Sequence, residues 1–362
     1  MPMKNKSWFK IEEAGSFPML SEASEIYEHI DDVCSREMFS NALLFSITND
    51  PIFIRKNIDL TQTGALFFEQ MKSVSERQPL IYGAGVRGNR IKRLYPEIKW
   101  GEYVDKSSSN ISAQSKENKC ISPDHIDRVI NRPILISVLS DYKNICQDLL
   151  HRGVHREDII ILEEWNEIAR KDQYFERRCI EDHIKEGAFI DAGSYDGMDT
   201  KRFLEKCPAR NDAWVFEPDH RQMAKCKEIL RALCEAHNVI FFEKGLSSKE
   251  ETLAFSVSYG GLSRITYSGQ SRIECTTIDK VVKSERVAYI KMDIEGYEEQ
   301  ALRGSEKTIR TQKPFLAISI YHRRADIIRI PKLILSLNPE YHFKLGHYSI
   351  GQVDTVLYAY SD

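Results

Sequence analysis

Residues 188–197, AFIDAGSYDG, decide the fold of this 362-residue chain. A short apolar run ends at Asp191, a glycine-containing turn follows, and the pattern after the turn is helical. A strand, a glycine turn and a helix in this order are typical of a parallel α/β sheet. The stretch therefore predicts a strand that ends in a loop suited to a ligand.

The same alternation continues to the end of the chain. Further apolar runs occupy 213–219, 239–247, 288–296 and 314–322, and the last two, 341–348 and 354–360, are separated by a short connection. A closely spaced final pair favours an antiparallel hairpin at the edge of an otherwise parallel sheet. A further strand, followed by a short helix, is expected within 272–282. We therefore expect one α/β domain over residues 175–362.

The first half of the chain divides into two parts. Residues 76–168 alternate strand and helix over a length that suits a smaller, half-size Rossmann-like α/β domain, with a polar loop at 106–119. Residues 1–75 have a helical pattern, with Ser21 or Ser24 as the expected N-cap and a break at 49–51. This helical segment suits packing or the formation of a homo-oligomer.

Composition excludes several classes of protein. There are 51 basic and 54 acidic side chains, so the net charge is -3 and no global field favours nucleic acid or an anionic membrane. No apolar run is long enough for a transmembrane helix, and the charged N-terminus lacks the pattern of a signal peptide. The eight cysteines are scattered without metal-site spacing, so we expect reduced thiols in a cytoplasmic protein.

The loop after the first strand of the C-terminal domain is a candidate cofactor site. It comprises Asp191, Gly193, Ser194, Asp196 and Gly197. The aspartate can orient the loop and approach an ammonium group, and the glycines let the backbone pass close to a ligand. The alternative is an ordinary turn aspartate.

The following strand ends in Glu217 and Pro218. A carboxylate at that position can accept hydrogen bonds from both hydroxyls of a ribose. Together with the preceding loop, it suits a cationic nucleoside with an amino-acid tail. A solvated acid at the end of a strand is the alternative.

The sequence KMDIEGYE, residues 291–298, places Asp293 and Glu295 at the end of another strand. If the strand extends that far, Lys291 and both carboxylates face one side. Two carboxylates near a reacting hydroxyl can orient it or bind a divalent metal. Capping of the next helix is the alternative.

His322 ends the strand after that and is our candidate general base, since an imidazole titrates near neutral pH. A packed or surface histidine is the alternative. Arg323 and Arg324 belong to a local basic cluster that can hold a phosphate or carboxylate of an acceptor. A solvated helix face explains the same residues.

A second nucleotide site is a candidate in the smaller domain. Gly83, Gly85 and Gly88 form a GxGxxG pattern between a strand and a helix, and Asp105 ends the next strand. This arrangement suits a dinucleotide, but a glycine turn is also needed simply to pack a helix on a strand. A structural half-domain is the favoured interpretation.

Taken in order, FIDAGSYDG, WVFEP, ECTTIDKV, YIKMDIEGYEEQALRG and DTVLYAY resemble the FkbM family of S-adenosylmethionine-dependent methyltransferases over about half the chain. The first half resembles the small Rossmann-like domain that precedes some members. The resemblance implies a class I methyltransferase sheet of seven strands, with the final hairpin supplying two of them. It assigns the cofactor to Asp191, Gly193, Gly197 and Glu217, and places Asp293 and Glu295 at the active-site end of a strand.

The expected activity is O-methylation of a sugar hydroxyl in a glycan, lipopolysaccharide, nucleotide-sugar or natural product. The expected cofactor is S-adenosylmethionine, with a divalent metal as an open option, and the expected partner is a carbohydrate-type acceptor. Two alternatives remain open: a nucleotide-sugar oxidoreductase or epimerase that uses the GAGVRG domain, and a cofactor-binding module without turnover.

Overall fold

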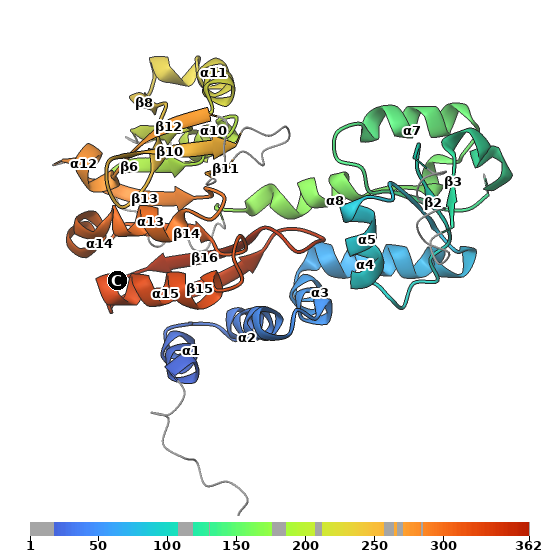
Figure 1. Ribbon diagram of the computed structural model, residues 1–362, viewed down its shortest axis with the longest axis horizontal. Helices are drawn as coiled ribbons and strands as arrows, with labels where there is room; N and C mark the ends of the chain where they lie inside the picture. The colour runs from blue at the N-terminus through green and yellow to red at the C-terminus, as the bar shows by residue number, and fades with distance from the viewer. Residues whose placement is uncertain are drawn as a thin grey trace, which may run out of the picture.

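The computed structural model describes residues 18–107, 119–129, 131–175, 186–206, 212–256, 264–265, 271–283 and 285–361. Two α/β units, built around a five-stranded and a seven-stranded sheet, are joined by helix α8 (Leu162–Ala169), which runs between them (Figure 1). Most of the loop predicted at 106–119 lies outside the described residues, as do Cys179 and Cys207.

The larger sheet has the order β15-β16-β14-β13-β6-β7-β8. Strand β16 is antiparallel to both of its neighbours, and the other pairs are parallel. This mixed seven-stranded sheet confirms the predicted α/β class and the antiparallel edge hairpin. Its strands are β6 (Ala188–Ala192), β7 (Ala213–Phe216), β8 (Val239–Phe242), β13 (Val287–Met292), β14 (Phe315–Ser319), β15 (His342–His347) and β16 (Thr355–Tyr360).

Alternate residues of the central strands divide between two buried layers. Ile190 and Ile290 belong to the core under one face, and Phe189 and Tyr289 belong to the core under the other. Because side chains alternate along a strand, a sheet covered by helices on both faces needs nearly continuous apolar strands. The covering helices are α10 (Met198–Lys206), α11 (His220–Ile229), α12 (Ile278–Val282), α13 (Glu298–Arg303), α14 (Glu306–Gln312) and α15 (Asp326–Leu337).

A small sheet that the sequence did not predict lies between β8 and β13 in the chain. Its order is β11-β10-β12-β9. We expected a strand within 272–282, but not the hairpin partner Glu251–Ser256, whose burial pattern is mostly partial. The strands are β9 (Gly245–Leu246), β10 (Glu251–Ser256), β11 (Arg264–Ile265) and β12 (Ser271–Thr276).

The five-stranded sheet is parallel throughout and has the order β3-β2-β1-β4-β5. Its strands are only two or three residues long: β1 (Leu80–Tyr82), β2 (Tyr103–Val104), β3 (Cys120–Ile121), β4 (Ile134–Ile136) and β5 (Ile159–Ile161). Helix α5 (Val86–Leu94) follows the glycine loop, and α7 (Tyr142–His151) follows β4. Strand β3 was not expected, since it follows a polar stretch.

In the described residues from Pro18 on, four α-helices precede the first sheet: α1 (Pro18–Glu28), α2 (Val33–Thr48), α3 (Pro51–Asp59) and α4 (Gln62–Val74). Ser21 and Ser24 lie inside α1, so their prediction as N-caps was wrong. Asp32 instead caps α2 by accepting a hydrogen bond from Ser35 N (2.8 Å). The expected break at 49–51 is present, and Asp50 starts α3 there.

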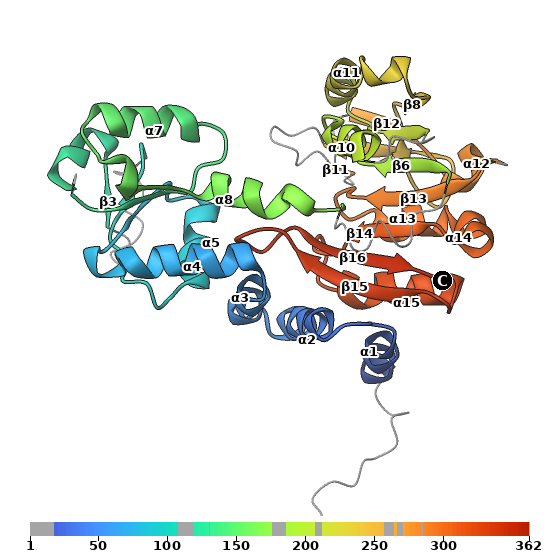
Figure 2. The same ribbon diagram turned by 180° about the vertical axis from the view of Figure 1, so that it is seen from behind.

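The first helices and the last strands lie against each other (Figure 2). The link between α1 and α2 pairs with β15, where Asp31 N donates to Phe343 O (3.1 Å) and Phe343 N donates to His29 O (2.8 Å). The link therefore covers the exposed edge of the seven-stranded sheet.

The loop between β15 and β16 joins the two units. Ile350, at its tip, is buried in the apolar cluster that contains Phe67 and Leu135 of the first unit. Its backbone N donates to Asn166 Oδ1 of α8 (2.9 Å). Buried apolar packing together with a buried hydrogen bond fixes the two units relative to each other.

Among the described residues, no helix combines the length and the apolar composition that crossing a membrane requires. Six cysteines lie in the described part of the chain, and none of them forms a disulfide there.

Candidate active site

A cleft of about 950 Å³ lies at the carboxyl ends of the parallel strands. Parallel strands bring the residues that follow them to one edge of the sheet, where α/β folds bind their ligands. Many of the predicted site residues line this cleft together: Gly193, Ser194, Asp196, Glu217, Pro218, Asp293, Glu295 and His322. The structure thus gathers residues from four strand ends into one site.

The glycine loop after β6 fits closely under the next strand end. Gly193 has φ +79°, and a Cβ on it would lie 2.0 Å from the carbonyl oxygen of Asp293. Its N–H donates to Phe216 O (3.0 Å). Only glycine tolerates both this conformation and this contact, so the loop can hold its backbone at the cleft. Gly197 (φ +85°) packs instead against Cys226 of α11, away from the cleft.

Asp191 lies beneath the loop and not in the cleft. It is fully buried; its Oδ1 is 3.0 Å from Lys291 Nζ, and its Oδ2 accepts a hydrogen bond from Thr200 Oγ1 (2.7 Å). Lys291 Nζ also donates to Gly193 O (2.8 Å). Asp191 therefore orients the loop through Lys291 and is not among the residues that line the cleft, and its approach to a ligand's ammonium group stays a prediction.

Asp199, which we did not predict, faces the cleft from the first turn of α10. Its Oδ2 lies 3.6 Å from Lys291 Nζ. Burial raises the pKa of Asp199 to about 6, although the lysine opposes the increase. Paired with Asp191 and Asp199, Lys291 keeps its charge, because these acids raise its pKa against the effect of burial.

Glu217 is 7% exposed and is held by two backbone amides. Its Oε2 accepts from Tyr195 N (3.0 Å) and its Oε1 accepts from Asp219 N (2.8 Å). Burial raises its pKa to about 7 despite these bonds. Each carboxylate oxygen can accept a further hydrogen bond, so Glu217 is fixed in place and still able to bind a pair of hydroxyls.

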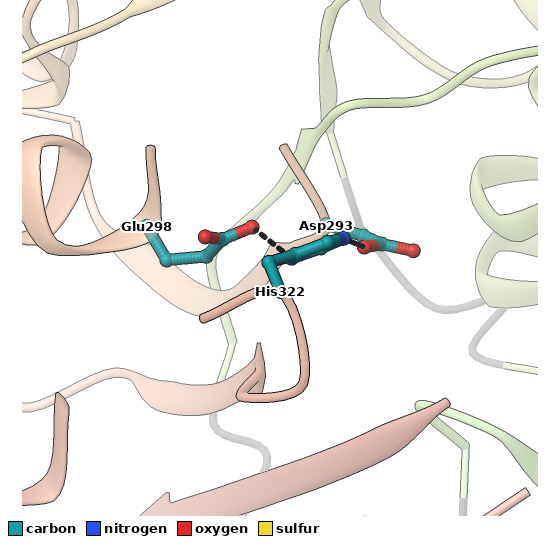
Figure 3. Close-up of side chains that lie close together, drawn as sticks. All are labelled: Asp293, Glu298 and His322. Atoms are coloured by element: carbon teal, nitrogen blue, oxygen red, sulfur yellow. Dashed lines mark ion pairs between the residues drawn. The ribbon is translucent and has the colours of Figure 1, made fainter. Parts of the chain in front are cut away.

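His322 lies between carboxylates (Figure 3). Its Nδ1 is 3.0 Å from Glu298 Oε1, and its Nε2 is 3.4 Å from Asp293 Oδ1 and 3.7 Å from Glu295 Oε2. Burial lowers the pKa of His322, but Glu298, Asp293 and Glu295 more than reverse this and raise it to about 9. The ring is therefore an imidazolium at neutral pH.

Asp293 is also oriented by two tyrosines. Its Oδ2 accepts from Tyr174 OH (2.9 Å) and its Oδ1 accepts from Tyr321 OH (3.2 Å). Burial raises the pKa of Asp293, but His322 and Lys291 outweigh burial and lower it overall. The carboxylate is thus ionised and held in one orientation at the cleft.

Asp293, Glu298 and His322 are the described residues whose ligand atoms come close enough to suggest a metal site. However, Glu298 and Asp293 approach opposite edges of the imidazole ring (Figure 3). A metal bound to one ring nitrogen would not reach both carboxylates as they lie, whereas an imidazolium carries positive charge at both edges of the ring and attracts both carboxylates. The arrangement therefore fits a proton-bearing histidine, and a metal at Asp293 and Glu295 stays a prediction.

The basic residues after His322 do not line the cleft as the structure describes it. Arg324 Nη2 donates to Asn49 Oδ1 at the end of α2 (2.6 Å), and the backbone N of Arg323 donates to Asp326 Oδ2 (2.9 Å). Their predicted contact with an acceptor thus finds no support in their positions.

Hydrogen bonds from neighbouring side chains hold the glycine loop of the smaller unit in place. Asp105 Oδ2 accepts from Ala84 N (2.9 Å), and Asn89 Nδ2 donates to Ala84 O (2.9 Å). A Cβ on Gly88 would lie 2.1 Å from the carbonyl oxygen of Gly83, so Gly88 is required for packing α5 on β1, whereas a Cβ on Gly85 would meet nothing within 4 Å. Packing accounts for Gly88, and nucleotide binding here stays a prediction.

Sequence reasoning missed several residues of the site. Glu298 ends the KMDIEGYE motif, and Asp199 lies just after the glycine loop. Both could have been proposed as site residues because they lie next to a recognised motif. Tyr174 and the lining residues of the smaller unit had no such signal, because they come from outside the motif-bearing segment.

Residues 191–345 match the family model described as the methyltransferase FkbM domain. Among solved structures, methyltransferase FkbM from Methylobacillus flagellatus KT is similar, with 17% identity and a TM-score of 0.47 over 91% of this chain and 99% of that one. Fibrillarin from Aeropyrum pernix, with natively bound S-adenosyl-L-methionine, matches at 11% identity and a TM-score of 0.33 over 49% of this chain and 68% of that one. A methyltransferase from Podospora anserina bound to SAH matches at 11% identity and a TM-score of 0.29 over 71% of this chain and 96% of that one. Comparison with curated proteins gave no match.

Proposed function

We propose, from the premise that residues 191–345 of this chain carry a methyltransferase FkbM domain, that the protein transfers a methyl group from S-adenosylmethionine to a sugar hydroxyl. The observation that supports this most directly is the cleft, where the glycine loop, Glu217, Asp293 and His322 meet. S-adenosylmethionine supplies an already activated methyl group, so the protein's main task is to align the acceptor with it.

Glu217 is the residue suited to the ribose hydroxyls, since its two oxygens are fixed by amides and can accept further hydrogen bonds. Gly193 presents its backbone beside that carboxylate. A buried carboxylate with a pKa of about 7 binds hydroxyls best when it is ionised.

The acceptor hydroxyl is placed at the end of the cleft where Asp293, Glu295 and His322 converge. Its oxygen forms the new bond to the methyl carbon, the carbon–sulfur bond breaks, and the hydroxyl proton passes to a base. We assign that base to Nε2 of neutral His322. Because the pKa is about 9, the neutral ring is the minor form at pH 7, roughly 1% of the molecules, but it is a strong base.

Two measurements test the activity. S-adenosylhomocysteine should raise the melting temperature of the full chain, because a ligand that binds only the native state stabilises it. Glycans of cells with and without the gene, compared by mass spectrometry, should differ by a methyl group. If NAD stabilised the protein and S-adenosylhomocysteine did not, the oxidoreductase alternative would replace this proposal.

A further inference from the structure

The cleft is built by both α/β units. Leu139 and Ser140 follow β4 of the five-stranded sheet, and Glu163, Glu167 and Arg170 come from α8 and the turn after it. These residues line the same cleft as Asp293 and His322. The smaller unit, to which no function is assigned, thus forms one wall of the proposed methyltransferase site.

This wall is fixed to the rest of the site by charge as well as by packing. Arg170 hydrogen-bonds to Glu163, and its Nη1 lies 3.7 Å from Asp354 Oδ2 in the loop between β15 and β16. Glu163 also accepts from Arg87 Nη2 of α5 (2.5 Å). The same loop buries Ile350 in the core of the smaller unit. The two walls of the cleft, one from each unit, therefore lie at a fixed distance from each other, as a binding site requires.

Apolar side chains remain exposed where the walls face each other. Leu139 of the smaller unit is 46% exposed and Val353 of the loop before β16 is 38% exposed. Tyr195 (40%) and Met198 (37%), beside the glycine loop, line the cleft too. A ligand that covers exposed apolar groups in one cleft removes them from water, and this lowers the free energy of the complex.

Charge in the cleft disfavours an anion. Among the described residues, eight carboxylates line it, against four lysines and arginines and the His322 imidazolium. Arg170 lies against Glu163 and Asp354, and Lys291 lies against Asp191 and Asp199, so these cations are already neutralised. A phosphate or carboxylate near Asp293 would meet Asp293, Glu295 and Glu298, three carboxylates against one imidazolium, and this excess of like charge is costly in a partly buried site.

We propose that the acceptor is an uncharged glycoside held between the two units, with its apolar group against Leu139 and Val353 and its reacting hydroxyl at Asp293 and His322. The inference rests on the proposed function, since it takes a sugar hydroxyl as the methylated group. It gives the smaller unit a role in choosing the acceptor.

The test measures binding to the full chain by calorimetry, with and without S-adenosylhomocysteine. The probes are p-nitrophenyl β-D-glucopyranoside and p-nitrophenyl β-D-glucuronide. In the glucuronide a carboxylate replaces the C6 hydroxymethyl group of the glucoside. We expect the glucoside to bind, and the glucuronide to bind about tenfold more weakly or less. No binding by the glucoside, or tighter binding by the glucuronide, overturns the inference.

Leu139→Asp and Val353→Asp should each weaken glucoside binding by about tenfold or more, because each places a charge against the apolar group. Leu150→Asp is the matched control, since Leu150 is 40% exposed on α7 of the same unit and is not among the residues that line the cleft. All three variants should keep the melting temperature and the S-adenosylhomocysteine affinity of the wild type. An unchanged glucoside affinity in both cleft variants also overturns the inference.

The two proposals fail separately. If S-adenosylhomocysteine does not bind the wild type, the methyltransferase proposal fails, whatever the glycosides do. If S-adenosylhomocysteine binds and the glucoside does not, only the acceptor inference fails.

Discussion

Nδ1 of His322 lies 3.0 Å from Oε1 of Glu298, a carboxylate that is 1% exposed. Oε1 also accepts a hydrogen bond from Ile294 N (2.8 Å), so the carboxylate is fixed at the start of α13. A buried carboxylate beside Nδ1 favours a proton on that nitrogen, while Nε2 lies on the side of Asp293 and Glu295. The pair thus determines both the orientation and the basicity of the ring.

This pair predicts the pH dependence of turnover. In the proposed mechanism neutral His322 is the active form, and its pKa is about 9, so log kcat should rise with pH from 7 and level off near 9. Glu298→Gln removes a carboxylate that raises the pKa, so the midpoint should move towards 6.5. Initial rates of methyl transfer from pH 6 to 10 measure this.

Glu299→Gln is the control, since Glu299 pairs with Arg303 on the same helix and does not contact the ring. It should keep the wild-type profile. A wild-type profile that is flat between pH 6 and 10 would assign the proton to Asp293 instead, because the pKa of that carboxyl is lowered.

Lys291→Met should destabilise the protein by about 3–5 kcal/mol. The substitution leaves the fully buried Asp191 and the partly buried Asp199 without the cation that they share. Urea unfolding measures the loss. Lys280→Met, which removes a pair with Glu250 that is more than half exposed on both sides, should cost less than about 1 kcal/mol. Equal losses in the two variants would contradict the buried pair.

Gly193→Ala should cost at least about 2 kcal/mol and reduce cofactor affinity. Its Cβ would meet the carbonyl oxygen of Asp293, and the backbone there has φ +79°. Gly85→Ala in the other glycine loop is the control: a Cβ at Gly85 meets nothing within 4 Å, and its φ is −76°. That variant should stay within about 0.5 kcal/mol of the wild type. The prediction fails if Gly193→Ala unfolds at the wild-type urea concentration.

The affinity for S-adenosylhomocysteine should increase as pH rises from 6 to 8. The pKa of Glu217 is about 7, and the ionised carboxylate is the form that accepts hydrogen bonds from ribose hydroxyls. Below that pKa, each pH unit should weaken binding by up to about tenfold. Glu217→Gln should bind weakly and without this dependence. Glu228→Gln, an exposed residue on α11, should behave as the wild type in the same calorimetric titration.

Much of the fold follows from local pattern. Apolar runs bounded by glycine and acidic turns predict the strands β6, β7, β13 and β14, because strands buried on both faces must be apolar throughout. The strand Glu251–Ser256 was missed because it is only partly buried and lacks that pattern. The separation of α1 from α2 was missed because Asp32 acts as a cap within what looks like one apolar repeat.

The site was predictable where residues follow strand ends, and not where distant segments meet. Glu217, Asp293 and His322 each follow the end of a strand, so the sheet alone brings them together. Asp191 is in register with Lys291 on the neighbouring strand, a pairing that no single strand reveals, and this pairing withdraws its carboxylate from the cleft. Arg324 was expected at the acceptor because it is adjacent to His322, but Asn49, from another part of the chain, holds it.

The pairing of Asp31 with Phe343 sets an order of events during synthesis. Helices α1 and α2 leave the ribosome well before the apolar surface that receives them, α15 and β15, has been made. Ile26, Ile30 and Phe39 therefore stay without these partners until β15 has emerged. Contacts between such distant segments close slowly, and the exposed helices are a point where nascent chains can associate wrongly or recruit a chaperone.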